Sequence, residues 1–224
     1  MWRALLILVC FALGCSSDEV ARGTAIPVTA PNAPVVADAP VEPSTTADIE
    51  LSTVEITLER TECYGWCPSY QLRIHGDGRV EYHGSAFVRE LGDREWRVSE
   101  EVVRELLARI APERFFALAE RYAQAVSDCP SELIGLRVAD RKHKVENYWS
   151  RASLEDFKKY SRPGTAAVEE WRIHQLLSNL ATAIDDAVVV GQWIGTSSER
   201  AEIARTRRSD DYLDGAPPTK FAPW

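Results

Sequence analysis

The sequence contains none of the short motifs that mark the common catalytic and nucleotide-binding sites. It has no G-x-S-x-G nucleophile turn, no H-E-x-x-H zinc motif and no glycine-rich phosphate loop. It has only four His, and no spacing among its 34 acidic residues singles out a catalytic pair of carboxylates. These absences exclude the enzyme classes that such motifs define, and we expect no cofactor.

Positive charge is also scarce. The chain carries 26 Lys and Arg against 34 Asp and Glu, which gives a net charge of −8 and a pI of about 5.1. Because phosphate backbones are bound chiefly by Lys and Arg, this balance argues against binding to nucleic acid. We therefore expect no nucleic acid among the partners of the protein.

The apolar run near the start of the chain is too short to cross a bilayer as a helix. Ala4–Leu13 has ten residues, whereas a membrane-spanning helix needs roughly twenty. The run follows Arg3, and its length is typical of the hydrophobic region of a signal peptide. We therefore predict that residues 1–14 are a signal peptide.

The signal peptide is followed by a Cys in a specific context. The segment Ala12-Leu13-Gly14-Cys15-Ser16-Ser17 resembles the bacterial lipobox, in which a small residue precedes an obligatory Cys. The resemblance implies that Cys15 is lipidated and anchors the protein to a membrane of the cell envelope. Because Ser16 rather than Asp follows, the known sorting pattern favours the outer membrane in a two-membrane bacterium. Ordinary secretory cleavage after Gly14 is the alternative.

Two polar segments flank the central part of the chain. Residues 16–50 contain five Pro, six acidic residues, one basic residue and no aromatic residue. Such a segment cannot bury enough apolar surface to offset its ordering entropy, so we predict that residues 15–50 form a lipidated, disordered tether. Residues 196–224 balance acids against bases, and we predict a polar tail with a short helix near Ser198–Arg208.

The first part of the domain has the alternation of β-strands. Apolar and polar residues alternate over 51–61 and again over Tyr70–Ile74, and Gly76-Asp77-Gly78 then supplies the turn of a hairpin. We predict a further strand at Phe87–Leu91, and Trp96 closes the sheet after a Gly-Asp turn. These strands follow one another closely, which is typical of an antiparallel sheet.

Helical spacing and a second hairpin follow. We predict one helix that begins at Ser99 and three further helices over Pro112–Val126, Ser153–Tyr160 and Ala166–Val188. We also predict a hairpin over Leu133–Trp149, with its turn at Asp140-Arg141-Lys142. The order of elements indicates an α+β fold, in which an antiparallel sheet built from hairpins has helices packed on one face. We place this single domain at residues 51–195.

One part of the domain is more specific than the rest. Cys63-Tyr64-Gly65-Trp66-Cys67-Pro68-Ser69-Tyr70 is followed by Asp77-Gly78-Arg79-Val80-Glu81-Tyr82-His83-Gly84. The two segments resemble the signature of a bacterial family of exported domains and lipoproteins of unknown function, C-x-G-x-C-P-x-Y and D-G-x-V-x-Y-x-G. The resemblance implies a single exported domain and leaves its chemistry open.

The Cys residues are the clearest candidates for chemistry. Thiols beyond the inner membrane tend to be oxidised, so we predict a disulfide between Cys63 and Cys67 and no metal there. Their spacing is C-x-x-x-C, which disfavours a thioredoxin-type redox pair. A bond that involves Cys129, a thiol-redox role and a metal site that adds a His to these Cys residues are the alternatives.

The favoured function is a binding or structural module that is displayed in the cell envelope on a lipid tether. An envelope protein or a glycan is the expected partner besides the membrane itself. Tyr64, Trp66 and Tyr70 are the candidate ligand contacts, because aromatic side chains exposed beside the Cys pair would favour binding. The alternative is an envelope enzyme whose site is assembled from residues distant in sequence, and converging His and carboxylate groups in a pocket would favour it.

Overall fold

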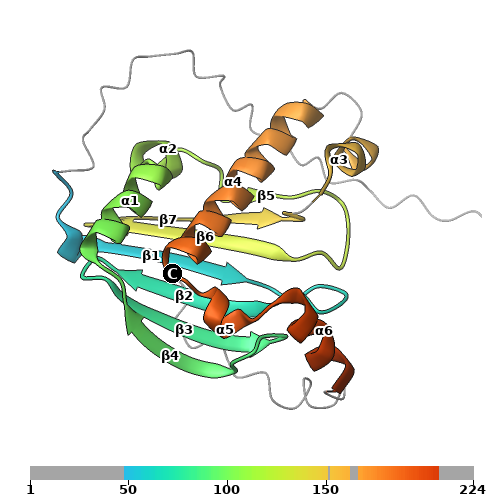
Figure 1. Cartoon of the computed structure of the whole chain (residues 1–224). Coiled ribbons are helices and arrows are strands. Elements are labelled where there is room, and N and C mark those ends of the chain that lie inside the picture. Colours follow the sequence, from blue (N-terminus) through green and yellow to red (C-terminus); the bar gives the residue numbers. More distant parts are fainter. Residues whose placement is uncertain (1–47, 151, 162–165, 207–224) are drawn as a thin grey trace, which may run out of the picture. The chain divides into compact units, whose positions relative to one another are not determined.

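The computed structural model describes residues 48–150, 152–161 and 166–206, which form one seven-stranded sheet and the helices around it (Figure 1). The strands are β1 (Val54–Arg60), β2 (Ser69–His75), β3 (Arg79–Ala86), β4 (Gly92–Arg97), β5 (Arg121–Tyr122), β6 (Ser131–Val138) and β7 (Arg141–Tyr148). The helices are α1 (Glu100–Ile110), α2 (Pro112–Phe116), α3 (Leu154–Tyr160), α4 (Ala167–Ala187), α5 (Gly191–Ile194) and α6 (Ser197–Thr206). The predicted signal peptide, Cys15 and nearly all of the predicted tether lie outside the described residues.

Hairpins build the sheet, whose strand order is β4-β3-β2-β1-β6-β7-β5. Every neighbouring pair from β4 to β7 is antiparallel, and β5 adds to the edge of the sheet parallel to β7. The helices α1 and α4 lie over one face of the sheet (Figure 1). The predicted α+β fold is therefore confirmed.

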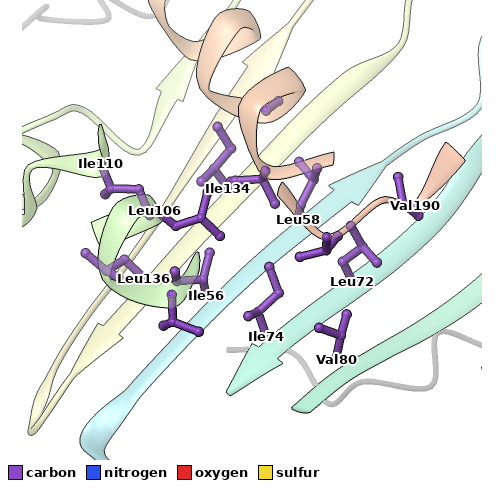
Figure 2. Packing of buried hydrophobic residues seen from close by; sticks show 14 of the residues in the cluster. Ile56, Leu58, Leu72, Ile74, Val80, Leu106, Ile110, Ile134, Leu136 and Val190 are labelled. Atoms are coloured by element: carbon purple, nitrogen blue, oxygen red, sulfur yellow. The ribbon is translucent and has the colours of Figure 1, made fainter. Parts of the chain in front are cut away.

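The alternation read from the sequence explains the hydrophobic core. Ile56 and Leu58 of β1 and Leu72 and Ile74 of β2 point to the same face and have no exposed surface (Figure 2). Leu106 of α1 packs on this layer. Each such side chain contributes about 1.5–3 kcal/mol by leaving water, so the core between the sheet and the helices dominates the stability of the domain.

The two long helices begin and pack as their sequences predict. The backbone N–H of Val102 donates to the Ser99 hydroxyl at 3.4 Å, which caps α1. Along α4, Leu177, Ala181 and Ile184 recur at helical spacing and are buried against the sheet. The short helix α3 is confirmed as well, because its N-terminal Ser likewise accepts a backbone hydrogen bond.

The predicted strand at Phe87–Leu91 is wrong. Phe87 has a φ of +50°, which lies outside the extended region that a strand requires. The backbone N–H of Glu90 donates to the carbonyl of Trp193 in α5 at 2.9 Å, so the segment pairs with α5 and not with a strand. The next strand starts at Gly92, where the sequence predicts a turn.

The predicted helix over Pro112–Val126 ends much earlier, at Phe116. After it the chain straightens, and the carbonyl of Glu120 accepts a hydrogen bond from the backbone N–H of Glu146 at 2.8 Å. The unpaired edge of β7 therefore takes up the following residues as β5. An apolar pattern this short suits either a helix or a strand, and pairing with β7 decides between them.

The turn of the second hairpin also differs from the prediction. Val138 of β6 pairs directly with Arg141 of β7, so Ala139-Asp140 forms a two-residue turn. Ala139 has a φ of +55°, which matches the positive φ that such tight hairpin turns need at their first central position. Arg141 is therefore the first residue of β7 and not the centre of the turn.

The helix expected near the C-terminal end is present as α6. It contacts the rest of the domain through Glu199, whose carboxylate accepts hydrogen bonds from Nη2 of Arg89 at 2.7 and 2.8 Å. The segment that begins at residue 196, predicted as a tail, thus has regular structure as far as Thr206. Within the described ranges, no helix is both long enough and apolar enough to cross a membrane.

Candidate functional site

Polar side chains replace apolar ones at one end of the sheet, on the face that the helices cover. In the register of neighbouring strands, Tyr70 of β2 lies opposite Arg60 of β1, Arg60 lies opposite Glu132 of β6, and Glu132 lies opposite Asn147 of β7. None of the four is more than 8% exposed. We call Tyr70, Arg60, Glu132 and Asn147 the polar row.

The helix α4 contributes the acidic partner of the polar row. Nη2 and Nε of Arg60 donate to Oδ2 of Asp185 at 2.8 and 3.0 Å, and the Tyr70 hydroxyl donates to Oδ1 of Asp185 at 2.7 Å. On its other side, Nη1 of Arg60 is hydrogen-bonded to Oε1 of Glu132. One buried guanidinium therefore holds two carboxylates from distant parts of the chain.

Asn147 joins the polar row to a second part of α4. Its Nδ2 lies 3.2 Å from Oε2 of Glu132 and 3.1 Å from the Ser178 hydroxyl. Its Oδ1 accepts a hydrogen bond from Nδ1 of His174 at 2.6 Å. His174, Ser178 and Asp185 are four and seven residues apart, so they share one face of the helix. This spacing lets α4 bond to the whole row.

The charges of the cluster follow from burial and from its close pairs. Burial opposes the charge of Arg60, but Tyr70, Asp185 and Glu132 together raise its pKa above the ordinary value, so the guanidinium stays charged. Burial raises the pKa of Asp185 despite the bonds from Arg60 and Tyr70. Burial, and then the charge of Asp185, raise the pKa of Tyr70. Burial lowers the pKa of His174, which favours the neutral ring.

A loop with two exposed aromatic residues lies at the same end of the sheet. Cys63 and Cys67 are joined by a disulfide with a Cα–Cα distance of 5.6 Å, and we call residues 63–67 the Cys loop. The Tyr64 side chain is 92% exposed and that of Trp66 is 58% exposed. The backbone N–H of Tyr64 donates to the carbonyl of Asp128 at 2.9 Å, which ties the loop to the segment before β6.

The third aromatic residue predicted as a ligand contact lies elsewhere. Tyr70 is only 1% exposed, and its hydroxyl is bonded to Asp185 and Arg60 in the polar row. Inward-facing positions of β2 are covered by the helices, so Tyr70 does not share the exposed surface of Tyr64 and Trp66, and its contact with a ligand stays a prediction. Its role is to hold the acidic partner of Arg60 in place.

A small cavity lies between the Cys loop and the polar row. Its volume is about 20 Å³, and the residues that wall it include Arg60, Glu132, Cys67, Pro68, Pro130 and Ser150. A cavity needs roughly 10–15 Å³ to hold one water molecule, so this one fits a single small polar group. The Cys loop, the cavity and the polar row thus form one continuous candidate site.

The other candidate features of the domain point to no comparable site. A broader hollow of about 430 Å³ lies where the chain enters the domain, between residues 48–52 and Arg104 of α1. Within the part of the chain that the structure describes, no group of three His, Cys, Asp or Glu residues is arranged to hold a metal ion. Of the Cys residues that the structure describes, Cys129 carries the free thiol, and burial raises its pKa, which disfavours the reactive thiolate.

A match to a known protein family covers most of this site. Residues 54–163 match the model of DUF6438, a domain of unknown function. The match contains the Cys loop and the four strands of the polar row, and it ends before α4, which carries Asp185. No curated protein matches the chain. The chain is thus similar to a family whose description names no activity.

The polar row was not predicted from the sequence, although a signal for it exists. Val54, Ile56 and Leu58 face the core, and the same alternation places Arg60 inward. Ile134 and Leu136 likewise place Glu132 inward. A charged side chain at an inward position of a strand is rarely tolerated without a partner of opposite charge. Arg60 and Glu132 at such positions therefore each indicate a buried ion pair.

We expect one free thiol in the mature chain that follows Cys15. Titration of residues 16–224, unfolded without reductant, should find the thiol of Cys129 alone, because Cys63 and Cys67 are bonded to each other. The matched control is Cys129→Ser, which should leave no titratable thiol. Three thiols in the wild-type chain, or two in Cys129→Ser, would show that the bond in the Cys loop does not form in the protein.

Proposed function

We propose that the chain is a binding module of the cell envelope and that the Cys loop contacts its ligand. The observation that carries this proposal is the exposure of Tyr64 and Trp66 on a loop closed by a disulfide. Large aromatic side chains are seldom left so open without a partner, and each can bury about 150–250 Å². Their position beside a small polar cavity provides both an apolar and a polar contact.

The restricted conformation of the Cys loop supports a role in binding. The bond between Cys63 and Cys67 and the hydrogen bond from Tyr64 to Asp128 both restrict the loop before any ligand arrives. A ligand that binds a restricted loop loses less conformational entropy than one that must order it. The expected partner is an envelope glycan or an envelope protein, since both offer surfaces on which aromatic rings stack.

The proposal includes the location of the protein in the cell envelope. A signal peptide over residues 1–14 would export the chain, and a lipid on Cys15 would anchor it to the membrane, more readily to the outer membrane where two are present. A Pro-rich tether of 35 residues, 16–50, could extend on the order of 100 Å at about 3.1 Å per residue. The Cys loop could therefore reach partners well away from the anchor.

The test is a binding measurement on the full chain purified in detergent. Cosedimentation with peptidoglycan sacculi and, separately, with a protein-containing outer-envelope fraction gives an apparent Kd for each. The double variant Tyr64→Ala/Trp66→Ala should weaken the tighter of the two by about 100-fold or more, because hot-spot aromatic residues each contribute about 2 kcal/mol or more. Its melting temperature should stay within about 2 °C of the wild type, since both side chains are exposed.

The matched control removes two exposed apolar side chains from other parts of the surface. Leu91 and Leu176 are 41% and 60% exposed, and Leu91→Ala/Leu176→Ala should bind like the wild type. Equal losses in the two double variants, or wild-type binding by the Tyr64→Ala/Trp66→Ala chain, would mean that the Cys loop is not the contact surface.

A further inference from the structure

A free thiol lies at the same end of the sheet as the disulfide of the Cys loop. Cys129 forms no disulfide with the other Cys residues that the structure describes, and its Sγ donates to the carbonyl of Ser127 at 3.4 Å. Its side chain is only partly buried. A thiol and a disulfide can exchange partners when they approach each other, so the distance between Cys129 and the Cys loop decides whether they react.

The antiparallel pairing of β1 with β6 continues beyond the end of β1. The backbone N–H of Thr61 donates to the carbonyl of Ser131 at 3.1 Å, and the backbone N–H of Ser131 donates to the Thr61 hydroxyl at 2.8 Å. In an antiparallel pair, each residue forward on one segment corresponds to one residue backward on the other. Two residues beyond this pair, Cys63 therefore comes opposite Cys129.

A further hydrogen bond limits the distance between these two Cys residues. The backbone N–H of Tyr64 donates to the carbonyl of Asp128 at 2.9 Å. Cys63 precedes Tyr64 and Cys129 follows Asp128, so their Cα atoms belong to the two peptide groups that this bond joins. Standard backbone dimensions then keep the Cα atoms of Cys63 and Cys129 within roughly 8 Å of each other. A disulfide needs a Cα–Cα distance of about 4.4–6.8 Å, so a bond between them requires little backbone movement.

We propose that Cys129 and the Cys loop form a thiol–disulfide exchange site. The thiolate of Cys129 attacks Sγ of Cys63, and the bond between Cys129 and Cys63 forms as the bond between Cys63 and Cys67 breaks. Cys67 leaves as a thiolate and takes up the proton that Cys129 has lost. One disulfide and one thiol are present before and after the step, so it consumes no oxidant and no reductant.

The exchange opens the ring that restricts the Cys loop. Once Cys67 is released, no disulfide joins the two ends of the loop, and Tyr64 and Trp66 gain conformational freedom. The effect of this change on binding rests on the proposed function, because a ligand binds the closed loop at a lower entropic cost than the open loop. Burial raises the pKa of the Cys129 thiol, so its thiolate is scarce and the exchange is slow near neutral pH.

A map of the disulfides in the wild type tests the exchange. The full chain, purified in detergent, is kept at pH 8.5 for several hours without added thiol, because uncatalysed disulfide rearrangement takes minutes to hours. It is then treated with N-ethylmaleimide at pH 6, and the monomer from a non-reducing gel is digested with trypsin. The digestion separates residues 61–73, which contain Cys63 and Cys67, from residues 122–137, which contain Cys129. A fraction of the chains should carry the label on Cys67 and a disulfide between the two peptides.

The matched control for this map is Cys129→Ser, which should carry no label on Cys67. Label on Cys129 alone in every wild-type chain would overturn the proposed exchange. Label on Cys67 in the Cys129→Ser chain would overturn it as well, because Cys67 would then be released without Cys129.

Two single variants test which sulfur is attacked. Cys67→Ser keeps Cys63 with Cys129, and Cys63→Ser keeps Cys67 with Cys129. When the reduced full chain is oxidised with glutathione disulfide, Cys67→Ser should form the bond between Cys63 and Cys129 within one chain, whereas Cys63→Ser should retain glutathione on its Cys residues. Glutathione on both Cys residues of Cys67→Ser, or a bond within the chain in Cys63→Ser alone, would contradict attack on Cys63.

The effect on binding is tested with the two locked forms. Cys129→Ser keeps the ring of the Cys loop closed, and oxidised Cys67→Ser keeps it open. The open form should bind the preferred envelope fraction about tenfold more weakly, because the ligand must then order the loop. Equal affinities would show that the exchange does not control binding. The disulfide map uses no ligand, so failure of the cosedimentation would remove the proposed function and leave the exchange site standing.

Discussion

Replacing Arg60 by Met should lower the free energy of unfolding by about 3–5 kcal/mol, the loss typical of breaking a buried ion pair. Arg60 is 8% exposed, and its guanidinium is bonded to Tyr70, Asp185 and Glu132. Met fills much of the same volume but leaves two buried carboxylates without a positive partner. Part of the loss should return at low pH, where protonation removes the charge of the carboxyl groups.

The matched control lies on the neighbouring strand. Arg137 of β6 also forms an ion pair, with Glu55 at 3.0 Å, but its side chain is 44% exposed. Surface pairs contribute about 0–1 kcal/mol, so Arg137→Met should lower the free energy of unfolding by less than about 1 kcal/mol. Urea titrations of both variants and of the wild type measure the two losses. Losses of equal size for the two Arg residues would mean that the polar row is not a buried charged network.

Replacing Gly78 by Ala should lower the free energy of unfolding by about 2–4 kcal/mol, from a left-handed backbone and a steric clash together. Gly78 ends the turn between β2 and β3 with a φ of +81°. A Cβ there would lie 2.1 Å from the carbonyl oxygen of Val98. The two backbones approach so closely because the N–H of Val98 donates to the carbonyl of Gly78 at 2.9 Å.

Gly92 provides the control for this second prediction. It has a similar φ of +74°, but a Cβ added to it would meet nothing within 4 Å. Gly92→Ala therefore carries only the backbone cost, about 1–2 kcal/mol, and a urea titration should rank it well above Gly78→Ala in stability. If the two variants are equally stable, the contact between the hairpin turn and Val98 is looser than the structure indicates.

The elements that the sequence predicted correctly are those in which local chemistry and tertiary packing agree. The alternation around Ile56 and Leu72 marks strands that are buried on one face, and Ser99 caps α1 as its position predicts. Phe87–Leu91 shows the opposite case. Its apolar residues suit a strand, but the backbone of Glu90 pairs with Trp193, which is more than 100 residues away in the sequence. A contact at that separation leaves no local signal.

The same limit explains why the candidate site was only half predicted. The Cys loop is a local feature, so its Cys pair and its aromatic residues are visible in the sequence. The partners of Arg60 are not, because they depend on the register of β1 against β6 and on the placement of α4. With 34 acidic residues in the chain, inward alternation identifies Glu132 but cannot select Asp185 as the second acid.

Hydrogen exchange of the full chain, with and without the envelope fraction to which it binds more tightly, tests the central claim most directly. Backbone amides of the Cys loop, residues 63–67, and of the segment around Asp128 that is bonded to it should exchange more slowly in the bound state. Amides on the exposed side of α4 near Leu176 should be unchanged. Protection that is absent from the Cys loop and appears instead on α4 or at the outer strand β4 would contradict the assignment of the binding surface.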